Sequence, residues 1–378
     1  MLAAKTKDWF GMTKELLKIN IGLQHPSTHG VLRLITELDG ETVKSVEPVI
    51  GYLHRGMEKL AESRTYLQYL PMVDRVDYLS GFFCQEAFCS AVEKLSDIEV
   101  PERAKYIRCL LMELNRITSH LLWLGTYLMD LGASSPIFYA FREREMILRI
   151  FENLTGQRMM YNFHVFGGVK RDLSAEILDE IEKFLEIFPE KIKEYESILT
   201  DNPIFLSRTK GLGILTKNVA LNYSITGANL RASGLNTDFR KQKPYLVYDK
   251  LDFEVSTETA GDCYARYLVR IAEMKQSQRI AAQCVDYLKN NSGEFKNSSV
   301  NPLAIKPQGE ASSFVEAPRG LMICTVTADG SEKPYRVKWR TGSFYSVQIL
   351  PELLKDRNFA DIMAIFGSLD VILSEVDR

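Results

Sequence analysis

The sequence has no stretch that could cross a membrane and little imbalance of charge. No run of roughly eighteen uncharged apolar residues occurs, and the most apolar window, Leu121–Leu131, is too short to span a bilayer. The helix expected to contain this window also carries Glu113, Arg116 and His120. A formal net charge of −2 gives no electrostatic reason to expect nucleic-acid binding.

Cysteine is scarce and scattered. The six cysteines form no C-x-x-C pair, and Cys84 and Cys89 have no cysteine or histidine at ligand spacing. The sequence therefore predicts reduced, mostly buried thiols and no iron–sulfur cluster or other metal site in this chain. A glycine-rich nucleotide-binding fingerprint is also missing, which argues against an independent soluble enzyme.

Histidine is scarce as well, but three of the five histidines fall within two short segments. These segments are residues 24–30, QHPSTHG, and residues 51–59, GYLHRGMEK. The first segment precedes a hairpin signal, in which residues 31–38 and 41–50 flank the turn dipeptide Asp39-Gly40. A proline-containing loop held by a hairpin can place a titratable imidazole in a cavity, and histidine changes charge near neutral pH.

The remaining pattern predicts an α+β fold in one domain spanning residues 1–378. Strands are expected in residues 18–50, a helical core in 56–290, a surface loop in 290–308 and a C-terminal β/α segment in 315–378. Helices are predicted over residues 103–131, 139–155, 173–188 (ending at Pro189) and 260–289. A second hairpin is expected from residues 321–327 and 335–340. The fold class is therefore a mainly helical core with small antiparallel β layers from both ends.

Several long motifs occur along nearly the whole chain. They are HPSTHGVLRL, GYLHRGMEKLAE, LPMVDRVDYLS, NRITSHLLWLG, FREREMILRIFENLTGQRM, GGVKRDL, RASG, RYLVRIAEM, VEAPRG and GSLDVILSEVDR. In these motifs and their order the chain resembles the 49-kDa (D-type) subunit of the respiratory complex I (NDH-1) family, including the plastid and cyanobacterial H-type versions. The resemblance implies a fold related to the large subunit of nickel–iron hydrogenases.

The resemblance also implies a quinone pocket. His29 would face the quinone headgroup, with His25 in the same loop, and Tyr78 would be the second headgroup ligand. A donor that titrates near neutral pH can protonate a quinone oxygen as electrons arrive. Asp130 would stabilise the imidazolium of His29 and raise its pKa, and Met72, where many relatives have tyrosine, would lie beside the pocket. Without the family, the same residues would be turn-shaping loop histidines, a core tyrosine and an exposed helix-end aspartate.

Two arginines are implied to tune a cluster in a neighbouring subunit. Arg55 and Arg75 would approach it, because a fixed positive charge stabilises the reduced cluster. The alternative is that each arginine forms a structural salt bridge with a nearby acidic residue: Glu58, Glu62, Asp74 or Asp77.

Besides Met72, the chain departs from the patterns of its implied relatives at three positions. Many respiratory members carry a histidine where this chain has Met160, so proton-linked tuning of the cluster by that residue is not expected. The positions that resemble cysteine ligands of nickel–iron hydrogenases carry Ile372 and Glu375. Neither is a thiolate, so a nickel–iron site is excluded.

The implied function is that of a peripheral-arm subunit in a proton-translocating NADH, NAD(P)H or ferredoxin:quinone oxidoreductase. The chain would bind no prosthetic group alone and would receive electrons from a 4Fe-4S cluster in a small subunit of the B or K type. Other expected partners are subunits of the C/J and I types and a membrane subunit of the H/A type. The expected location is the membrane periphery, on the cytoplasmic side of the bacterial inner membrane or the stromal side of the thylakoid. The alternative is a non-catalytic scaffold in a hydrogenase-like or ferredoxin-linked membrane complex.

Overall fold

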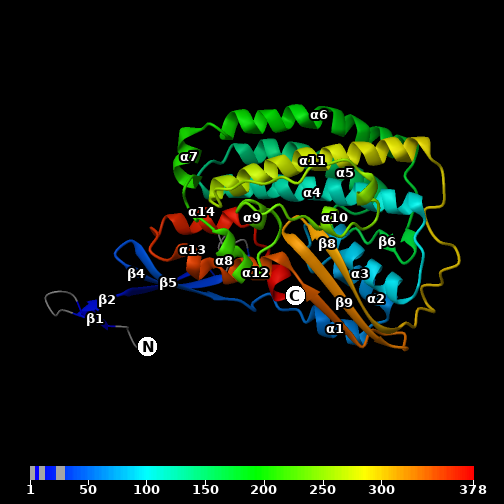
Figure 1. The fold of residues 1–378 in the computed structure, drawn as a ribbon, viewed down its shortest axis with the longest axis horizontal. Coiled ribbons are helices and arrows are strands. Elements are labelled where there is room, and N and C mark those ends of the chain that lie inside the picture. The colour runs from blue at the N-terminus through cyan, green and yellow to red at the C-terminus, as the bar shows by residue number, and fades with distance from the viewer. Residues whose placement is uncertain (1–4, 8–12, 23–29) are drawn as a thin grey trace.

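The computed structural model describes residues 5–7, 13–22 and 30–378. These residues form an α+β structure with long helices at its centre and small antiparallel sheets from both ends of the chain, as predicted (Figure 1). No helix within these ranges is both long and apolar enough to cross a membrane. His25 and His29 lie outside the described residues.

Four long helices form the centre of the molecule. They are α4 (Glu102–Asp130), α5 (Pro136–Thr155), α6 (Ala175–Leu199) and α11 (Cys263–Asn290). Helix α4 packs against α5 and α11, and α6 covers both of these partners. The helix predicted over residues 103–131 is confirmed as α4, which is buried around most of its circumference because apolar residues occupy more than one face. The predicted end of the second helix is also confirmed, since Gly156 caps α5 with a φ of 79°.

The prediction that the third helix ends at Pro189 is wrong. Helix α6 continues through Pro189 to Leu199. Phe188 and Ile192 are buried on either side of the proline, whereas Pro189 itself lies on the exposed face. An interior proline costs a helix about 3 kcal/mol. Burial of the apolar face against α5 and α11 offsets that cost.

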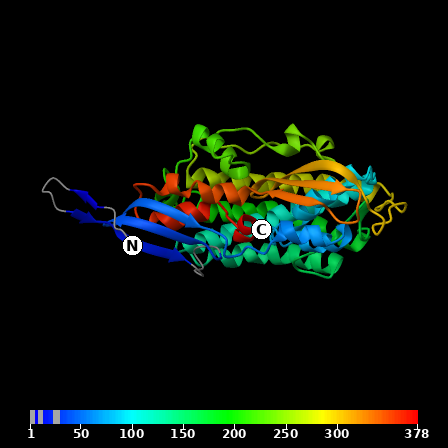
Figure 2. The same ribbon diagram turned by 90° about the horizontal axis from the view of Figure 1, so that it is seen from below.

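Two three-stranded antiparallel sheets lie at the two ends of the chain. The first contains β3 (Leu17–Gly22), β4 (Arg33–Asp39) and β5 (Thr42–Val49), and it confirms the hairpin predicted at Asp39-Gly40. The second contains β8 (Gln308–Ala317), β9 (Gly320–Asp329) and β10 (Arg336–Arg340), and it confirms the second hairpin. Strand β8 was not predicted. A two-stranded ribbon of β1 (Lys5–Lys7) and β2 (Thr13–Glu15) lies farthest from the long helices (Figure 2).

Shorter elements connect the sheets to the long helices. Helices α1 (Met57–Ser63), α2 (Tyr66–Val73) and α3 (Gly81–Leu95) follow the first sheet, and α3 packs against β8 and β9. The middle of the chain contains β6 (His164–Val165), β7 (Gly168–Val169), α7 (Pro203–Thr209), α8 (Lys217–Asn222), α9 (Gly227–Arg231), α10 (Phe239–Gln242) and the 3₁₀ turn η2 (Tyr248–Lys250). The chain ends with α12 (Gly342–Gln348), α13 (Leu350–Leu354), α14 (Asp361–Ser368) and α15 (Leu373–Asp377).

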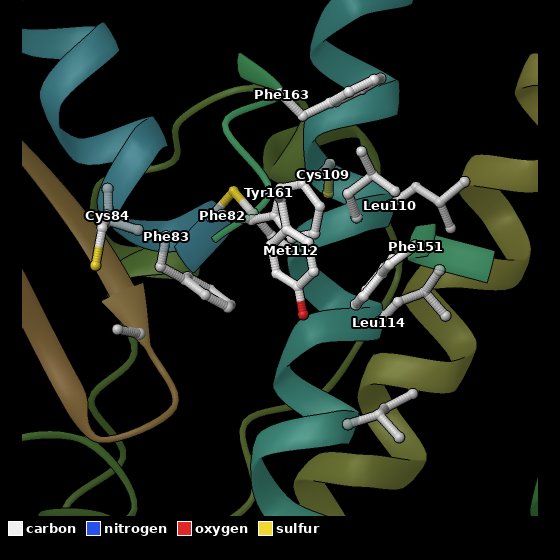
Figure 3. Packing of buried hydrophobic residues seen from close by; sticks show 14 of the residues in the cluster. Phe82, Phe83, Cys84, Cys109, Leu110, Met112, Leu114, Phe151, Tyr161 and Phe163 are labelled. Atoms are coloured by element: carbon white, nitrogen blue, oxygen red, sulfur yellow. The ribbon is translucent and has the colours of Figure 1, made fainter. Parts of the chain in front are cut away.

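Two apolar clusters hold these layers together. In the larger cluster, Phe82 of α3 stacks on Tyr161 with 4.3 Å between ring centroids, and Phe151 of α5 meets Phe82 edge-on at 5.1 Å (Figure 3). In the smaller cluster, β5 packs against α13, and buried residues of β4, α12 and α14 belong to the same cluster. The C-terminal helices therefore fill the space between the first sheet and the long helices. All six cysteine thiols are free and buried, as predicted.

Candidate functional site

The loop between α2 and α3 contains Asp74, Asp77 and Tyr78. Its first residue is fixed by hydrogen bonds, since the Asp74 carboxylate accepts from Gln85 Nε2 at 2.7 Å and from the backbone N–H of Asn162 at 3.0 Å. Burial raises the pKa of Asp74 to about 7, although these donors act in the opposite direction. The loop is therefore anchored at its start to α3 and to the segment after α5.

Arg319, between β8 and β9, is the centre of a fully buried group of charges. Its Nη1 donates to Asp77 Oδ2 at 2.7 Å and to Ser80 Oγ at 3.1 Å. Its Nη2 donates to Ser119 Oγ on α4 at 3.0 Å and lies 3.4 Å from Asp370 Oδ1. One guanidinium thus ties together the α2–α3 loop, α4 and the C-terminal segment. A buried cation is tolerated only with such partners.

The C-terminal segment adds two more buried carboxylates. Asp370 adopts the left-handed conformation with a φ of 55°, which is unusual outside glycine. Glu375 accepts hydrogen bonds from the backbone N–H groups of Gly342 at 3.3 Å and Ser343 at 3.2 Å, and from the Ser343 hydroxyl. Burial and the nearby charge of Asp77 raise the pKa of Glu375 to about 7, against the lowering effect of Arg319. Glu375 is therefore poised to exchange a proton near neutral pH.

Tyr78 is half-buried beside these charges. Burial raises the pKa of its hydroxyl, the Arg319 guanidinium lowers it, and the carboxylates of Asp77 and Asp370 raise it. The hydroxyl is thus kept protonated next to a charged, buried interior. Met72 is the next-to-last residue of α2 and is half-buried against the larger apolar cluster.

Arg55 and Arg75 lie side by side and bond to backbone carbonyl groups. Arg55 donates from Nη1 to the carbonyl of Arg75 at 2.8 Å and from Nη2 to that of Ser374 at 2.9 Å, and Arg75 donates to the carbonyl of Pro71. Burial lowers the pKa of Arg55, and the charge of Asp377 raises it. Neither arginine has a carboxylate within 4.0 Å among the described residues, so the predicted salt bridges are not formed there.

The acidic residues proposed for those salt bridges have other partners. Glu58 pairs with Arg336 at 3.1 Å and with Lys338 at 3.2 Å. Glu62 pairs with Lys59 and with Arg336. The charges of Arg55 and Arg75 act on Asp377 and on Asp74, respectively, without a direct ion pair.

Asp130 ends α4 and approaches the same C-terminal segment from another side. A Cβ added at Gly367 in α14 would lie 3.4 Å from Asp130 Oδ2, and the indole N–H of Trp123 donates to the Gly367 carbonyl at 2.8 Å. Gly30 is the first described residue after the histidine segment, and a Cβ added at Gly30 would lie 3.7 Å from the Cβ of Leu373. Gly30 therefore lies beside the segment that carries Asp370 and Glu375.

His164 and Met160 lie in the segment after α5. The His164 ring is fully buried, tilted against Phe82 at 5.6 Å, with Nδ1 3.5 Å from Glu86. Burial lowers the pKa of His164 to about 4, although Glu86 raises it. His164 is therefore neutral at physiological pH and enclosed by this chain. Met160 is half-buried with a φ of 59°.

Asp77 and Glu375 were named from the sequence, but the roles of Arg319 and Asp370 were missed. All four lie in motifs that carried the resemblance, DRVDYLS, VEAPRG and GSLDVILSEVDR. A charged residue inside an otherwise apolar motif was the available signal, because such a residue is buried only with a partner. In the described ranges, no three His, Cys, Asp or Glu side chains come together in a way that could hold a metal ion.

The chain is similar in sequence to known proteins along nearly its whole length. The family described as "Respiratory-chain NADH dehydrogenase, 49 Kd subunit" matches residues 130–378. The D-type subunit of NADH-quinone oxidoreductase from Geobacillus thermodenitrificans is 49% identical over 366 residues, covering 97% of this chain and 99% of the relative. The chain belongs to this family. The protein of the same name from Bacillus mycoides is 45% identical over 365 residues, with the same coverage of both chains. The resemblance seen in the sequence motifs is thereby confirmed over nearly the whole chain.

Proposed function

We propose that the chain forms the quinone pocket of a proton-translocating NADH-quinone oxidoreductase, as a subunit of its peripheral arm. The overall reaction at this pocket adds two electrons and two protons to a quinone and gives the quinol. The electrons come from NADH and arrive one at a time through an iron–sulfur cluster of a neighbouring small subunit. The protons come from side chains of this chain. Ferredoxin as the electron source fits the same pocket.

The observation that carries the proposal is the position of Tyr78. Tyr78 is a half-buried residue, and it directly follows Asp77, which belongs to a fully buried set of charges with Arg319 and Asp370. A phenol held protonated at such a boundary can donate a hydrogen bond to a carbonyl oxygen and then its proton, as negative charge develops there. The charged group behind it stabilises that change in a site from which water is largely excluded.

The other pocket residues take the roles that the family implies. His29 gives the second proton, with His25 in the same loop and Asp130 stabilising the imidazolium. Both histidines lie outside the described residues. Met72 lines the pocket. Arg55 and Arg75, which form no direct ion pair with a carboxylate in the described ranges, present positive charge toward the neighbouring cluster.

The proposed assembly follows from these roles. The chain lies on the cytoplasmic side of the membrane, or on the stromal side of a thylakoid. There it contacts the cluster-bearing B/K-type subunit, C/J-type and I-type subunits, and the H/A-type membrane subunit that completes the pocket. The alternative is a scaffold without a working pocket. It gives no functional reason for the buried charges beside Tyr78.

Substitution of Tyr78 tests the function. In the assembled complex, Tyr78→Phe is expected to slow quinone reduction about tenfold. Loss of a lone general acid typically lowers the rate roughly 10²- to 10⁴-fold. The roughly tenfold effect expected here is smaller because His29 remains as a second proton donor. NADH-dependent reduction of the cluster, followed by EPR, should be unchanged. The matched control is Tyr264→Phe, a half-buried tyrosine on α11 whose hydroxyl donates to the Thr200 carbonyl at 3.1 Å. Full quinone turnover in Tyr78→Phe would contradict the pocket.

The cluster potential is expected to be nearly independent of pH. A histidine beside a cluster couples its reduction to protonation, but Met160 cannot take a proton, and His164 is buried with its pKa lowered to about 4. The midpoint potential should therefore stay flat between about pH 6 and 8, the range in which an ordinary histidine titrates. Redox titration of the EPR signal measures it. A slope near about 59 mV per pH unit would show that another residue supplies the coupled proton.

A further inference from the structure

The interior of the long helices contains an unusual number of charged side chains. Among the largest fully buried side chains are six arginines: Arg108, Arg116, Arg231, Arg240, Arg266 and Arg270. Burying a charge is costly, and apolar residues of similar size are often as stable or more so. The presence of these buried charges therefore calls for a functional explanation, and many of the charges lie along one path through the molecule.

The first part of the path runs between α4, α10, α9 and α11. Glu113 and Arg240 are 3.2 Å apart, Arg240 and Asp238 are 2.7 Å apart, and Asp238 lies 3.8 Å from Arg231. Arg231 then pairs with Glu273 of α11 at 2.5 Å. The run ends at His120 of α4, whose Nε2 lies 2.8 Å from Glu273 Oε2.

The second part of the path starts at the proposed quinone pocket. Asp77, next to Tyr78, pairs with Arg319 at 2.7 Å, and Arg319 lies 3.4 Å from Asp370. Asp370 Oδ2 lies 4.0 Å from Arg270 Nε, which is too far for a direct hydrogen bond. Asp370 is thus the last group of this part before His120.

The two parts face each other across polar atoms that lack partners. His120 Nδ1, Asp370 Oδ2, Arg270 Nε and Arg319 Nε are buried, and none has a hydrogen-bond partner among the described residues. Arg319 donates to Ser119, the residue before His120, and to Asp77, the residue before Tyr78, and it lies 3.4 Å from Asp370. The charge of Asp370 raises the pKa of both His120 and Tyr78. Arg270 lowers the pKa of His120, and burial lowers it most. Buried polar atoms are rarely left unpaired, and such groups are commonly bridged by ordered water.

We propose that the space bounded by His120 Nδ1, Asp370 Oδ2 and Arg270 Nε holds ordered water that relays protons from His120 to Asp370 and Tyr78. We call this space the His120–Asp370 gap. The relay rests on the proposed function, because it refills a proton that Tyr78 has given to the quinone. His120 would act as a positioning residue that reaches the quinone only through water and Tyr78.

The proton balance of the relay is simple. Tyr78 gives its hydroxyl proton to a quinone oxygen, which has gained electrons from the neighbouring cluster, and is left as a phenolate. Water in the gap, hydrogen-bonded to Asp370, returns one proton to Tyr78. His120 in its imidazolium form gives its Nδ1 proton to that water and becomes neutral, while Glu273 keeps the Nε2 hydrogen bond. A proton from solvent restores the imidazolium before the next turnover. One proton leaves His120 for each proton that leaves Tyr78, and no electron passes through the relay.

The test is His120→Gln in the assembled complex. The glutamine amide can still donate to Glu273 but cannot carry a proton across the gap. The rate constant kcat for quinone reduction is expected to fall about tenfold, with KM for quinone unchanged, because His120 does not touch the substrate. The solvent isotope effect should rise, and EPR should show the cluster more reduced during turnover. The matched control is His164→Gln, another buried histidine beside a glutamate, 3.5 Å from Glu86; its turnover should be normal.

The outcomes separate the relay from the pocket. Normal kcat in His120→Gln, with Tyr78→Phe impaired, overturns the relay and keeps the pocket; normal kcat in both overturns the pocket as well. If His120→Gln does not assemble, a map of the unsubstituted complex at a resolution that shows waters decides the question. Density between His120 Nδ1 and Asp370 Oδ2 supports the relay, and a dry gap overturns it.

Discussion

Replacing Arg319 with methionine is expected to lower the free energy of unfolding by about 3–5 kcal/mol, the usual cost of removing one partner from a buried ion pair. The guanidinium donates to Asp77 and Ser80 through Nη1 and to Ser119 through Nη2. Methionine fills a similar volume but leaves the Asp77 carboxylate buried without its cation. Since a domain is stable by about 5–15 kcal/mol, this loss removes a large share of the total.

The same substitution should abolish quinone reduction in whatever complex still assembles, because Tyr78 loses the charge behind it. Urea unfolding of the purified chain measures the first effect, and quinone turnover per assembled complex measures the second. The control is Arg336→Met, an exposed arginine paired with Glu58 at 3.1 Å, which should cost less than about 1 kcal/mol. Equal costs for the two substitutions would show that the Arg319 group is not a stabilising centre.

The elements with strong local signals were predictable from the sequence. Residues 103–131 repeat apolar side chains with helical period, and Asp39-Gly40 allows one tight turn, so α4 and the first hairpin were found. The predicted helix end at Pro189 was wrong because the apolar face of α6 continues past the proline, and its tertiary packing outweighs the local helix-breaking signal. Strand β8 was missed because Gln308, Gly309 and Glu310 at its start are exposed and carry no alternating pattern.

The site was predictable only in part, for a different reason. Tyr78, Asp130 and the paired arginines were named from motifs that are continuous in sequence. The charged group around Arg319 is not continuous, since Asp77 and Arg319 are 242 positions apart. No local sequence pattern indicates which carboxylate forms an ion pair with which arginine. Only the packing of β8 and β9 on α3, with the C-terminal segment beside them, brings these groups together.

The backbone beside Arg319 shows how closely this packing is fitted. Three glycines from different segments cross there. A Cβ added at Gly227 would lie 2.4 Å from the Cα of Gly320, and one added at Gly320 would lie 2.6 Å from Thr226 Oγ1. A Cβ at Gly342 would lie 2.0 Å from the carbonyl oxygen of Arg319. Real Cβ atoms do not approach backbone this closely, so any side chain at Gly342 must push the Arg319 backbone away.

Gly342→Ala should therefore destabilise the chain by about 3 kcal/mol, the upper end for overpacking by one methyl group, and should slow quinone reduction by moving Arg319. Backbone cannot rotate away as a flexible side chain can, which is why the cost is high for one carbon. The control is Gly293→Ala, whose added Cβ would meet only the Arg103 Cβ at 3.7 Å, an ordinary contact. That variant should stay within about 0.5 kcal/mol of the parent chain. Urea unfolding and quinone turnover measure both variants, and a Gly342→Ala chain as stable and active as Gly293→Ala would mean that the crossing does not set the position of Arg319.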